Sequence, residues 1–182
     1  MQFKNTNNRY GGLSIGLHWL MFLLIVGVYT CMELHEFYPR GSDIREGLKH
    51  WHFMLGLSVF FLVWLRIIAK VWQVSPEITP DINKWQKLAA KGAHLALYLF
   101  MVGMPIGGWL ILSGEGENIP YFGLSMPPLI AENKELAETI EDIHKLVGNI
   151  GYFLIGLHAL VALFHHYYQK DNTLTRILPG KE

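Results

Sequence analysis

The stretch IHKLVGNIGYFLIGLHALVALFHHYY, residues 143–168, decides the fold. It is long and apolar enough to span a bilayer as one helix, yet it contains His144, His158, His165 and His166. His144 and His158 are fourteen residues apart, and on a helix this spacing returns to nearly the same face after a rise of roughly 21 Å. Two imidazoles on one face, at opposite ends of a membrane helix, suit two haems, one near each membrane surface.

Three other stretches have the same length and character. The predicted spans are about 13–32, 51–71, 92–112 and 146–168, each of about 20 residues. A short surface helix is also expected over 133–142, in the loop before the last span. None of the four spans alternates with the period of two that a membrane β-barrel requires, and inside lipid the other backbone structure that satisfies its own hydrogen bonds is the helix. The sequence therefore predicts an all-α integral membrane four-helix bundle, with residues 1–182 as a single membrane domain.

Composition excludes several classes of protein. Apolar residues make up 51% of the 182 residues and charged residues 16%, against about a quarter charged in soluble proteins. The formal net charge of zero argues against a nucleic-acid partner. Cys31 is the only cysteine, which excludes an internal disulfide and a cysteine-rich metal or iron–sulfur site. The polar N-terminal residues predict no cleavable signal peptide, so we expect the first span to act as the membrane signal.

Basic residues predict the orientation of the bundle. Ten of the fifteen fall on the side of the two termini and of the connection between the second and third spans: Lys4, Arg9, Arg66, Lys70, Lys84, Lys87, Lys91, Lys170, Arg176 and Lys181. By the positive-inside rule, both termini are then cytoplasmic.

Depth in the membrane sorts the histidines into pairs. A six-coordinate haem needs two neutral imidazoles that face each other from different helices at one depth. His52 opens the second span and His144 the fourth from the periplasmic side, so they form one pair. His158 lies in the cytoplasmic half, where its partner is His18 or His94, and His18 suits the depth better. These pairs predict two b-type haems.

Simpler interpretations remain for individual residues. A single membrane histidine can hydrogen-bond a neighbouring helix, although four histidines matched by depth across three helices are hard to explain by packing alone. For His94 we favour a structural role or a contact with a haem propionate, then a quinone site, over iron ligation.

Two haems with two histidine ligands each have no open coordination position, so they carry electrons rather than bind oxygen. Near the cytoplasmic surface, Ser14 and His165 are candidates to contact a quinone. His165 is the candidate proton donor, because the pKa of a histidine lies near neutrality. A backbone hydrogen bond for Ser14 and an interfacial position for His165 are the alternatives.

A local group of basic residues precedes His52. Arg45, Lys49 and their neighbours Arg40 and His50 are candidates to contact haem propionates, or to draw a small anion towards the haem edge. The periplasmic face as a whole is acidic, so only a local basic funnel would work, and a solvated loop is the alternative.

The chain resembles the prokaryotic cytochrome b561 family over nearly its whole length. The matching segments are Leu17-His18-Trp19-Leu20, His52 with Gly56, His94 through Tyr98 to Pro105-Ile106-Gly107, His144, and Gly151 through His158 and His165-His166-Tyr167 to Lys170-Asp171-Asn172-Thr173-Leu174. The last of these, together with Phe37-Tyr38-Pro39-Arg40, is similar to the branch typified by the bacterial superoxide oxidase. This resemblance implies a four-helix, dihaem inner-membrane protein that takes electrons from periplasmic superoxide and reduces ubiquinone. It also implies that helices one, two and four supply the iron ligands, which leaves His94 out.

The resulting hypothesis is a superoxide:quinone oxidoreductase with two haem b groups, and with ubiquinone as the electron acceptor. Its metal ligands are His18, His52, His144 and His158, its further cofactor-binding residues Ser14 and His94, and its catalytic residues His165, Lys49 and Arg45. One alternative is a quinol- or quinone-linked cytochrome that serves a periplasmic protein partner. Another is the membrane cytochrome subunit of a larger dehydrogenase.

Overall fold

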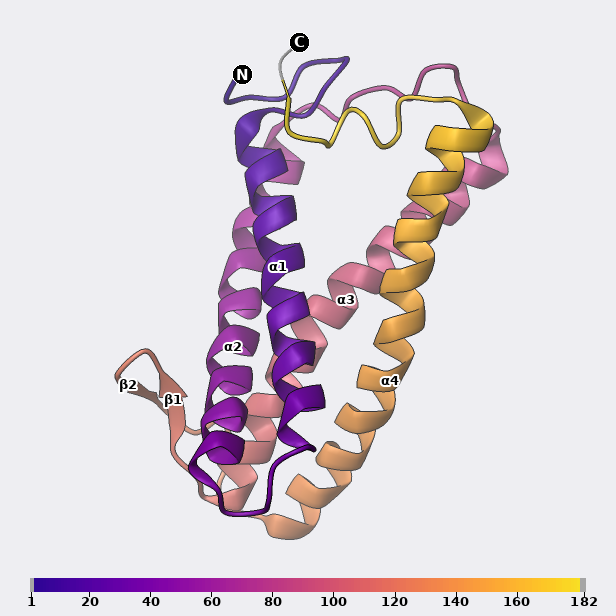
Figure 1. Cartoon of the computed structure of the whole chain (residues 1–182). Helices are drawn as coiled ribbons and strands as arrows, with labels where there is room; N and C mark the ends of the chain where they lie inside the picture. Colours follow the sequence, from indigo (N-terminus) through magenta and orange to yellow (C-terminus); the bar gives the residue numbers. More distant parts are fainter. Residues whose placement is uncertain (1, 181–182) are drawn as a thin grey trace.

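Four long helices make up most of the molecule (Figure 1). The computed structural model describes residues 2–180 and contains α1 (Gly12–His35), α2 (Asp43–Trp72), α3 (Lys84–Glu115) and α4 (Lys134–Phe164). All four helices are long and apolar enough to cross a membrane, with a mean hydropathy of 1.9 to 2.0 in their most apolar windows. The predicted all-α four-helix membrane bundle is therefore confirmed.

The helices extend beyond the predicted apolar spans because their caps lie in polar sequence. The Ser42 side chain accepts a hydrogen bond from the Arg45 amide at the start of α2, and Asn83 forms a capping box with Gln86 at the start of α3. The Asn133 side chain accepts a hydrogen bond from the Leu136 amide at the start of α4. The surface segment 133–142, expected as a separate short helix, is instead the first part of α4.

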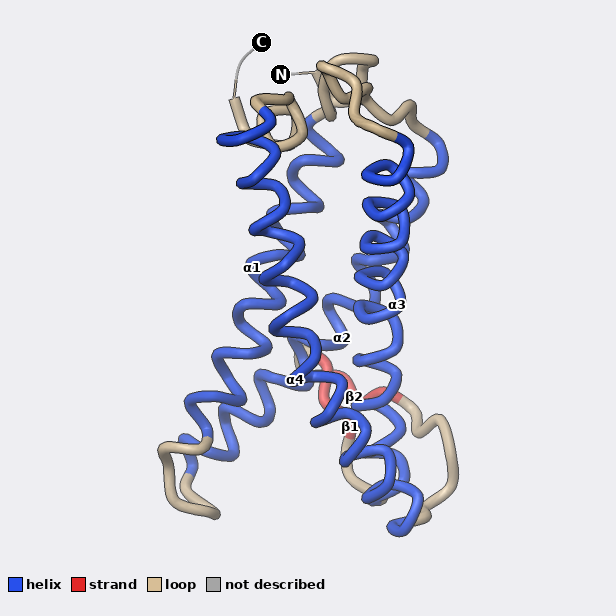
Figure 2. The backbone as a smooth tube through the Cα atoms, turned by 90° about the vertical axis from the view of Figure 1, so that its right-hand side faces the viewer, coloured by secondary structure: helices blue, strands red, loops and turns tan. Residues whose placement is uncertain are grey.

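The four helices form two closely packed pairs that cross. α1 packs along α2, α3 packs along α4, and α2 also packs against α3. In contrast, no Cα atom of α4 lies within 8 Å of a Cα atom of α1 or α2 in the described chain. Figure 1 shows α4 leaning away from α1 towards the end with both termini, and Figure 2 shows the helices separating towards the opposite end. We call the end with both termini the terminal end, and the opposite end the loop end.

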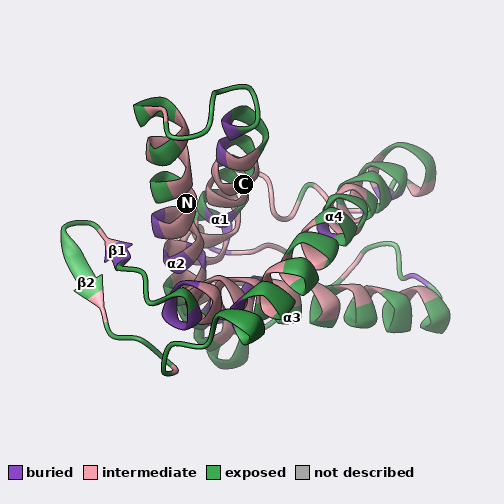
Figure 3. Cartoon of the chain, turned by 90° about the horizontal axis from the view of Figure 1, so that it is seen from below, coloured by how far each residue is buried: buried purple, intermediate pink, exposed green. Residues whose placement is uncertain are grey.

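Few side chains are fully buried, as expected for helices whose outer faces meet lipid. The main buried cluster joins Met21 of α1, Val59 and Val63 of α2 and Met101 of α3. Figure 3 shows mainly exposed residues along the outward faces of α3 and α4. The core therefore lies where α1, α2 and α3 meet, and α4 is the least buried helix.

A small hairpin that the sequence did not predict covers the loop end of α2. Strands β1 (Ile119–Tyr121) and β2 (Leu124–Met126) pair antiparallel around Phe122 and Gly123, which have φ values of 46° and 84°. Two adjacent residues with positive φ form a tight hairpin turn. Ile119 is buried against Leu57 of α2, which fixes the hairpin on the bundle.

The two termini close the terminal end together. After α4, the π-helical turn η1 (His165–Gln169) leads into a tail that runs back across the bundle to α1 (Figure 1). Asn172 exchanges hydrogen bonds with Thr79 in the loop between α2 and α3, and the Trp19 indole of α1 donates to the Ile177 carbonyl at 3.0 Å. This tail links α4 to both α1 and the α2–α3 loop.

Gly151 allows α1 and α3 side chains to pack tightly against α4. The Tyr29 hydroxyl donates a hydrogen bond to the Gly148 carbonyl at 2.7 Å and approaches Gly151 closely. A Cβ atom at position 151 would lie 2.5 Å from Cζ of Phe100. Since real Cβ atoms do not approach other atoms so closely, a larger residue here must displace the Tyr29 and Phe100 rings from their present packing.

We therefore expect Gly151→Ala to lower the apparent melting temperature of the purified protein in detergent. Overpacking of this kind costs about 1–3 kcal/mol. The matched control is Gly92→Ala on α3, where a Cβ atom would meet nothing within 4 Å. Equal melting temperatures for the Gly151 variant and the control would contradict the tight packing.

Candidate functional site

One histidine pair lies between α2 and α4 near the loop end. The ring centres of His52 and His144 are 6.3 Å apart. The two helices have no Cα atoms within 8 Å of each other, so the imidazoles extend from their helices into the space between them. His52 and His144 are thus brought together as the depth argument expected.

A second pair lies between α1 and α4 towards the terminal end. The ring centres of His18 and His158 are 6.4 Å apart. His94 of α3 is also close to His158, with ring centres 5.6 Å apart. The structure therefore places both expected candidates beside His158.

The ring separations fit two ligands on opposite sides of one metal ion. Two metal–imidazole nitrogen bonds of about 2 Å in line hold the ring centres about 6.3 Å apart. The separations of His52 from His144 and of His18 from His158 match this value, whereas that of His94 from His158 is shorter. Among the described residues, no group of three or more His, Cys, Asp or Glu side chains forms a metal site. The two histidine pairs at the matching separation are the candidate ligand sets.

Hydrogen bonds at the loop-end pair leave nitrogen lone pairs for a metal. His52 Nδ1 donates to the Val28 carbonyl of α1 at 3.2 Å, so Nε2 of the neutral ring carries the lone pair. His144 Nδ1 is buried and has no hydrogen-bond partner within residues 2–180. Gly107 lies directly beside it, because a Cβ atom there would be 3.2 Å from this nitrogen. A buried nitrogen without a hydrogen-bond partner is costly in a folded protein, so this atom marks His144 as a residue with a role beyond packing.

The terminal-end pair differs because an arginine contacts one of its rings. Arg66 of α2 places Nη2 2.7 Å from Nδ1 of His18. A guanidinium can only donate, so His18 Nδ1 is the acceptor in this arrangement. The sequence analysis counted Arg66 only among the basic residues that set the orientation, and nothing in the sequence pattern placed it beside a histidine.

His165 lies at the start of η1 and is buried against an aspartate. Its Nδ1 is 2.5 Å from Oδ2 of Asp171, and both side chains are less than a tenth exposed. Burial alone would raise the pKa of the Asp171 carboxyl, but the hydrogen bonds from His165 and Thr173 outweigh burial and hold this pKa below its usual range. Asp171 is therefore an anion at neutral pH and fixes the orientation of the imidazole.

The other predicted site residues have different surroundings. The Ser14 hydroxyl donates to the Asn5 side chain at 2.8 Å, which secures the N-terminal segment on α1. Arg45 donates to the carbonyls of His35 and Tyr38, and so holds the loop between α1 and α2. Lys49 is half-exposed, and its ammonium is 3.8 Å from Glu46.

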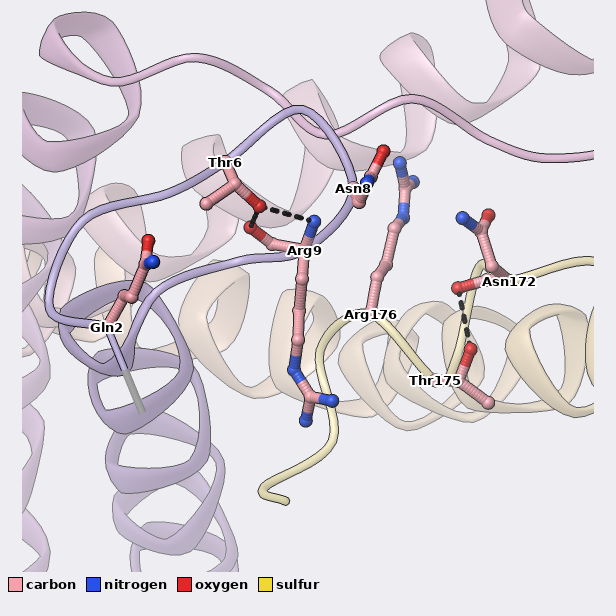
Figure 4. A pocket seen from close by; sticks show the side chains of 7 residues that line it. All are labelled: Gln2, Thr6, Asn8, Arg9, Asn172, Thr175 and Arg176. Atoms are coloured by element: carbon pink, nitrogen blue, oxygen red, sulfur yellow. Dashed lines mark hydrogen bonds between the residues drawn. The ribbon is translucent and has the colours of Figure 1, made fainter. Parts of the chain in front are cut away.

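A polar cavity of about 560 Å³ lies at the terminal end, between the N-terminal segment and the tail (Figure 4). Its lining residues are Gln2, Thr6, Asn8, Arg9, Asn172, Thr175 and Arg176. Figure 4 shows the two arginine heads pointing in opposite directions. None of the predicted site residues lines this cavity, so it is separate from the histidine pairs.

A membrane helix bundle with paired histidines between its helices has the architecture of a b-type cytochrome. The family model "Prokaryotic cytochrome b561" matches residues 9–180. The chain belongs to the prokaryotic cytochrome b561 family, which makes it a multi-pass membrane electron carrier and implies that the bundle binds two haem b groups.

Named relatives cover nearly the whole chain. It is 37% identical to "Cytochrome b561 homolog 1" of Escherichia coli K12 over 175 residues, which cover 96% of this chain and 99% of the relative. It is 38% identical to "Probable superoxide oxidase CybB" of Yersinia pestis over 175 residues, 96% of this chain and 98% of that protein. "Cytochrome b561 homolog 2" of Escherichia coli K12 is 28% identical over 186 residues, 98% of this chain and 95% of that relative.

Proposed function

We propose that this chain is a superoxide:quinone oxidoreductase that holds one haem b between His52 and His144 and another between His18 and His158. The main support is that two pairs of imidazoles, one towards each end of the bundle, have ring separations of 6.3 and 6.4 Å. The name of the Yersinia relative supports superoxide as the donor. Haem b, when bound, supplies uptake and release of one electron at a time.

We place both termini in the cytoplasm. α2 ends and α3 begins at the terminal end, so nine of the ten basic residues predicted to be cytoplasmic belong to this end, and Lys181 lies outside the described residues. The loop end carries the acidic start of α4, including Glu135, Glu138 and Asp142. This asymmetry fits the positive-inside rule.

Superoxide then arrives at the loop end. Lys49 lies one residue before His50 and three before His52, and its ammonium is accessible. Arg45 is largely enclosed by carbonyl groups, which leaves Lys49 as the better-placed cation to attract a small anion. Each superoxide loses one electron and leaves as dioxygen. Two superoxide ions thus supply the two electrons that, with two protons, convert ubiquinone to ubiquinol.

His165 is proposed to deliver protons to the quinone at the terminal end. Asp171 holds the proton of the neutral ring on Nδ1, so Nε2 is the nitrogen that accepts and donates a proton in turn. The π-helical turn that contains His165 is a local irregularity of a type that occurs often at functional sites. The Ser14 hydroxyl already donates its hydrogen bond to Asn5, so it is less available to donate to the quinone.

A second function has its own support. Glu132, Glu135, Glu138 and Asp142 are all exposed at the loop end, and an acidic surface repels superoxide but attracts a basic protein. An electron carrier between quinol and a periplasmic protein partner is therefore the competing proposal.

The ligand assignment predicts different haem contents for two variants. We expect His158→Ala to retain one haem per chain and His94→Ala to retain two, because His18, and not His94, lies at the ligand separation from His158. The measurement is haem per protein by the pyridine haemochrome method. Loss of one haem in His94→Ala would show that His94, and not His18, is the second ligand beside His158.

The two proposed functions differ in the reductant of the haems. We expect an enzymatic flux of superoxide to reduce the haems of the purified protein within seconds, and added ubiquinone to reoxidise them. Superoxide dismutase, added as a control, must abolish the reduction. Haems that stay oxidised under superoxide but become reduced with ubiquinol would support the quinol-linked carrier instead.

Removal of the proton donor is expected to slow quinone reduction without loss of haem. We expect His165→Ala to slow reoxidation of the haems by ubiquinone roughly tenfold or more, at the lower edge of what a positioned acid contributes. Asp171→Asn should slow it less, since the imidazole remains. His166→Ala is the matched control, because the imidazole that pairs with Asp171 is that of its neighbour His165. An unchanged rate in His165→Ala would remove this residue from the mechanism.

A further inference from the structure

Arg66 lies inside the bundle, at the level of the terminal-end histidines. It belongs to α2, six residues before the helix ends at Trp72. Its guanidinium reaches Nδ1 of His18 on α1, and its central carbon lies 5.9 Å from the centre of the Tyr98 ring on α3. This side chain therefore contacts both helices that flank α2.

No carboxylate of the described chain neutralises this arginine. The ion pairs formed within residues 2–180 involve other cations. Lys70, one turn further along α2, lies 4.9 Å from the same Tyr98 ring, but it is exposed and its ammonium can reach the membrane surface. Arg66 is further from the end of α2, inside the bundle, where a cation without a compensating anion is unfavourable. The site therefore lacks an anion.

The bond to His18 is incompatible with iron ligation by that residue. Because Arg66 must donate, His18 Nδ1 accepts, and a neutral ring then carries its proton on Nε2. A protonated Nε2 has no lone pair for a metal. Ligation through Nε2 requires the proton on Nδ1, which would face the guanidinium donor. Arg66 and an iron ion thus favour opposite tautomers of His18.

We propose that Arg66 binds a propionate of the haem held by His18 and His158. When haem binds, Arg66 gives up its hydrogen bond to His18 and donates to this carboxylate instead. The inference rests on the proposed ligand pair. A guanidinium binds a carboxylate through two parallel hydrogen bonds, which would supply the missing anion and free His18 Nδ1 to carry its proton. The retained positive charge favours the reduced iron, so Arg66 raises the reduction potential of this haem relative to the same haem without it.

The first test is a redox titration of the purified dihaem protein. We expect Arg66→Gln to lower the midpoint potential of one haem and to leave that of the other unchanged, and Arg66→Lys to restore part of the difference. Lys70→Gln is the matched control, because it removes a positive charge one turn away without touching His18, and it should leave both potentials unchanged. Equal shifts in the Arg66 and Lys70 variants would show a general effect of charge and overturn the proposal.

The second test asks whether the propionate itself is recognised. Haem-free protein is titrated with haem b and with its dimethyl ester, which has no carboxylates, and binding is followed by the absorbance of the bound haem. We expect the wild type to bind the ester at least tenfold more weakly at one of two sites, and Arg66→Gln to lose this discrimination. Equal discrimination in both proteins would overturn the proposal.

The failure of the proposed ligand pair and the failure of the role of Arg66 give different results. If His158→Ala retains both haems, the ligand pair itself is wrong. If His158→Ala loses one haem but both midpoint potentials stay unchanged in Arg66→Gln, only the role of Arg66 fails.

Discussion

The rest of the structure depends on one constraint: each of two histidines on α4 must meet a histidine from α1 or α2 across the space between these helices. The ring centres are 6.3 and 6.4 Å apart, while the helix backbones stay more than 8 Å from each other. Membrane helices without a cofactor usually pack more closely, through small residues at their interfaces. Here the small residue Gly151 sits midway between His144 and His158, and it allows contact with Tyr29 and Phe100. Side chains of α1 and α3 thus meet α4 at the level between the two histidine pairs.

The hydrogen bonds around each pair show how one helix can hold two different sites. At the loop end, the Val28 carbonyl takes the proton of His52 Nδ1 and leaves Nε2 for a metal. At the terminal end, the group beside His18 is a cation rather than a carbonyl. The two sites thus share a ligand type and differ in charge, and charge is one of the means by which a protein sets the reduction potential of a haem.

The sequence predicted what depends on hydrophobicity and depth, and missed what depends on side-chain direction. The four spans follow from apolar length, and the pairing of His52 with His144 follows from their positions at span ends; ligation itself stays a prediction. Arg66 was hidden because the orientation rule counts basic residues without regard to the direction in which they point. Asp171 was hidden because the π-helical turn after Phe164 brings residues six apart together, which a regular helix would not do. The helix expected over 133–142 was predicted as a separate element, and its continuity with the last span was missed because the spans were assigned from apolar residues alone, whereas this part of α4 is polar.

The tail that follows η1 has a consequence for how far α4 can move relative to the rest of the bundle. No Cα atom of α4 lies within 8 Å of a Cα atom of α1 or α2 in the described chain, so close backbone packing holds α4 only to α3. The tail adds an attachment at the terminal end, because its hydrogen bonds join Ile177 to Trp19 of α1 and Asn172 to Thr79 of the α2–α3 loop. A swing of α4 away from α1 at the terminal end would break these bonds. The tail thus acts as a tether that limits how wide the space around His158 can become.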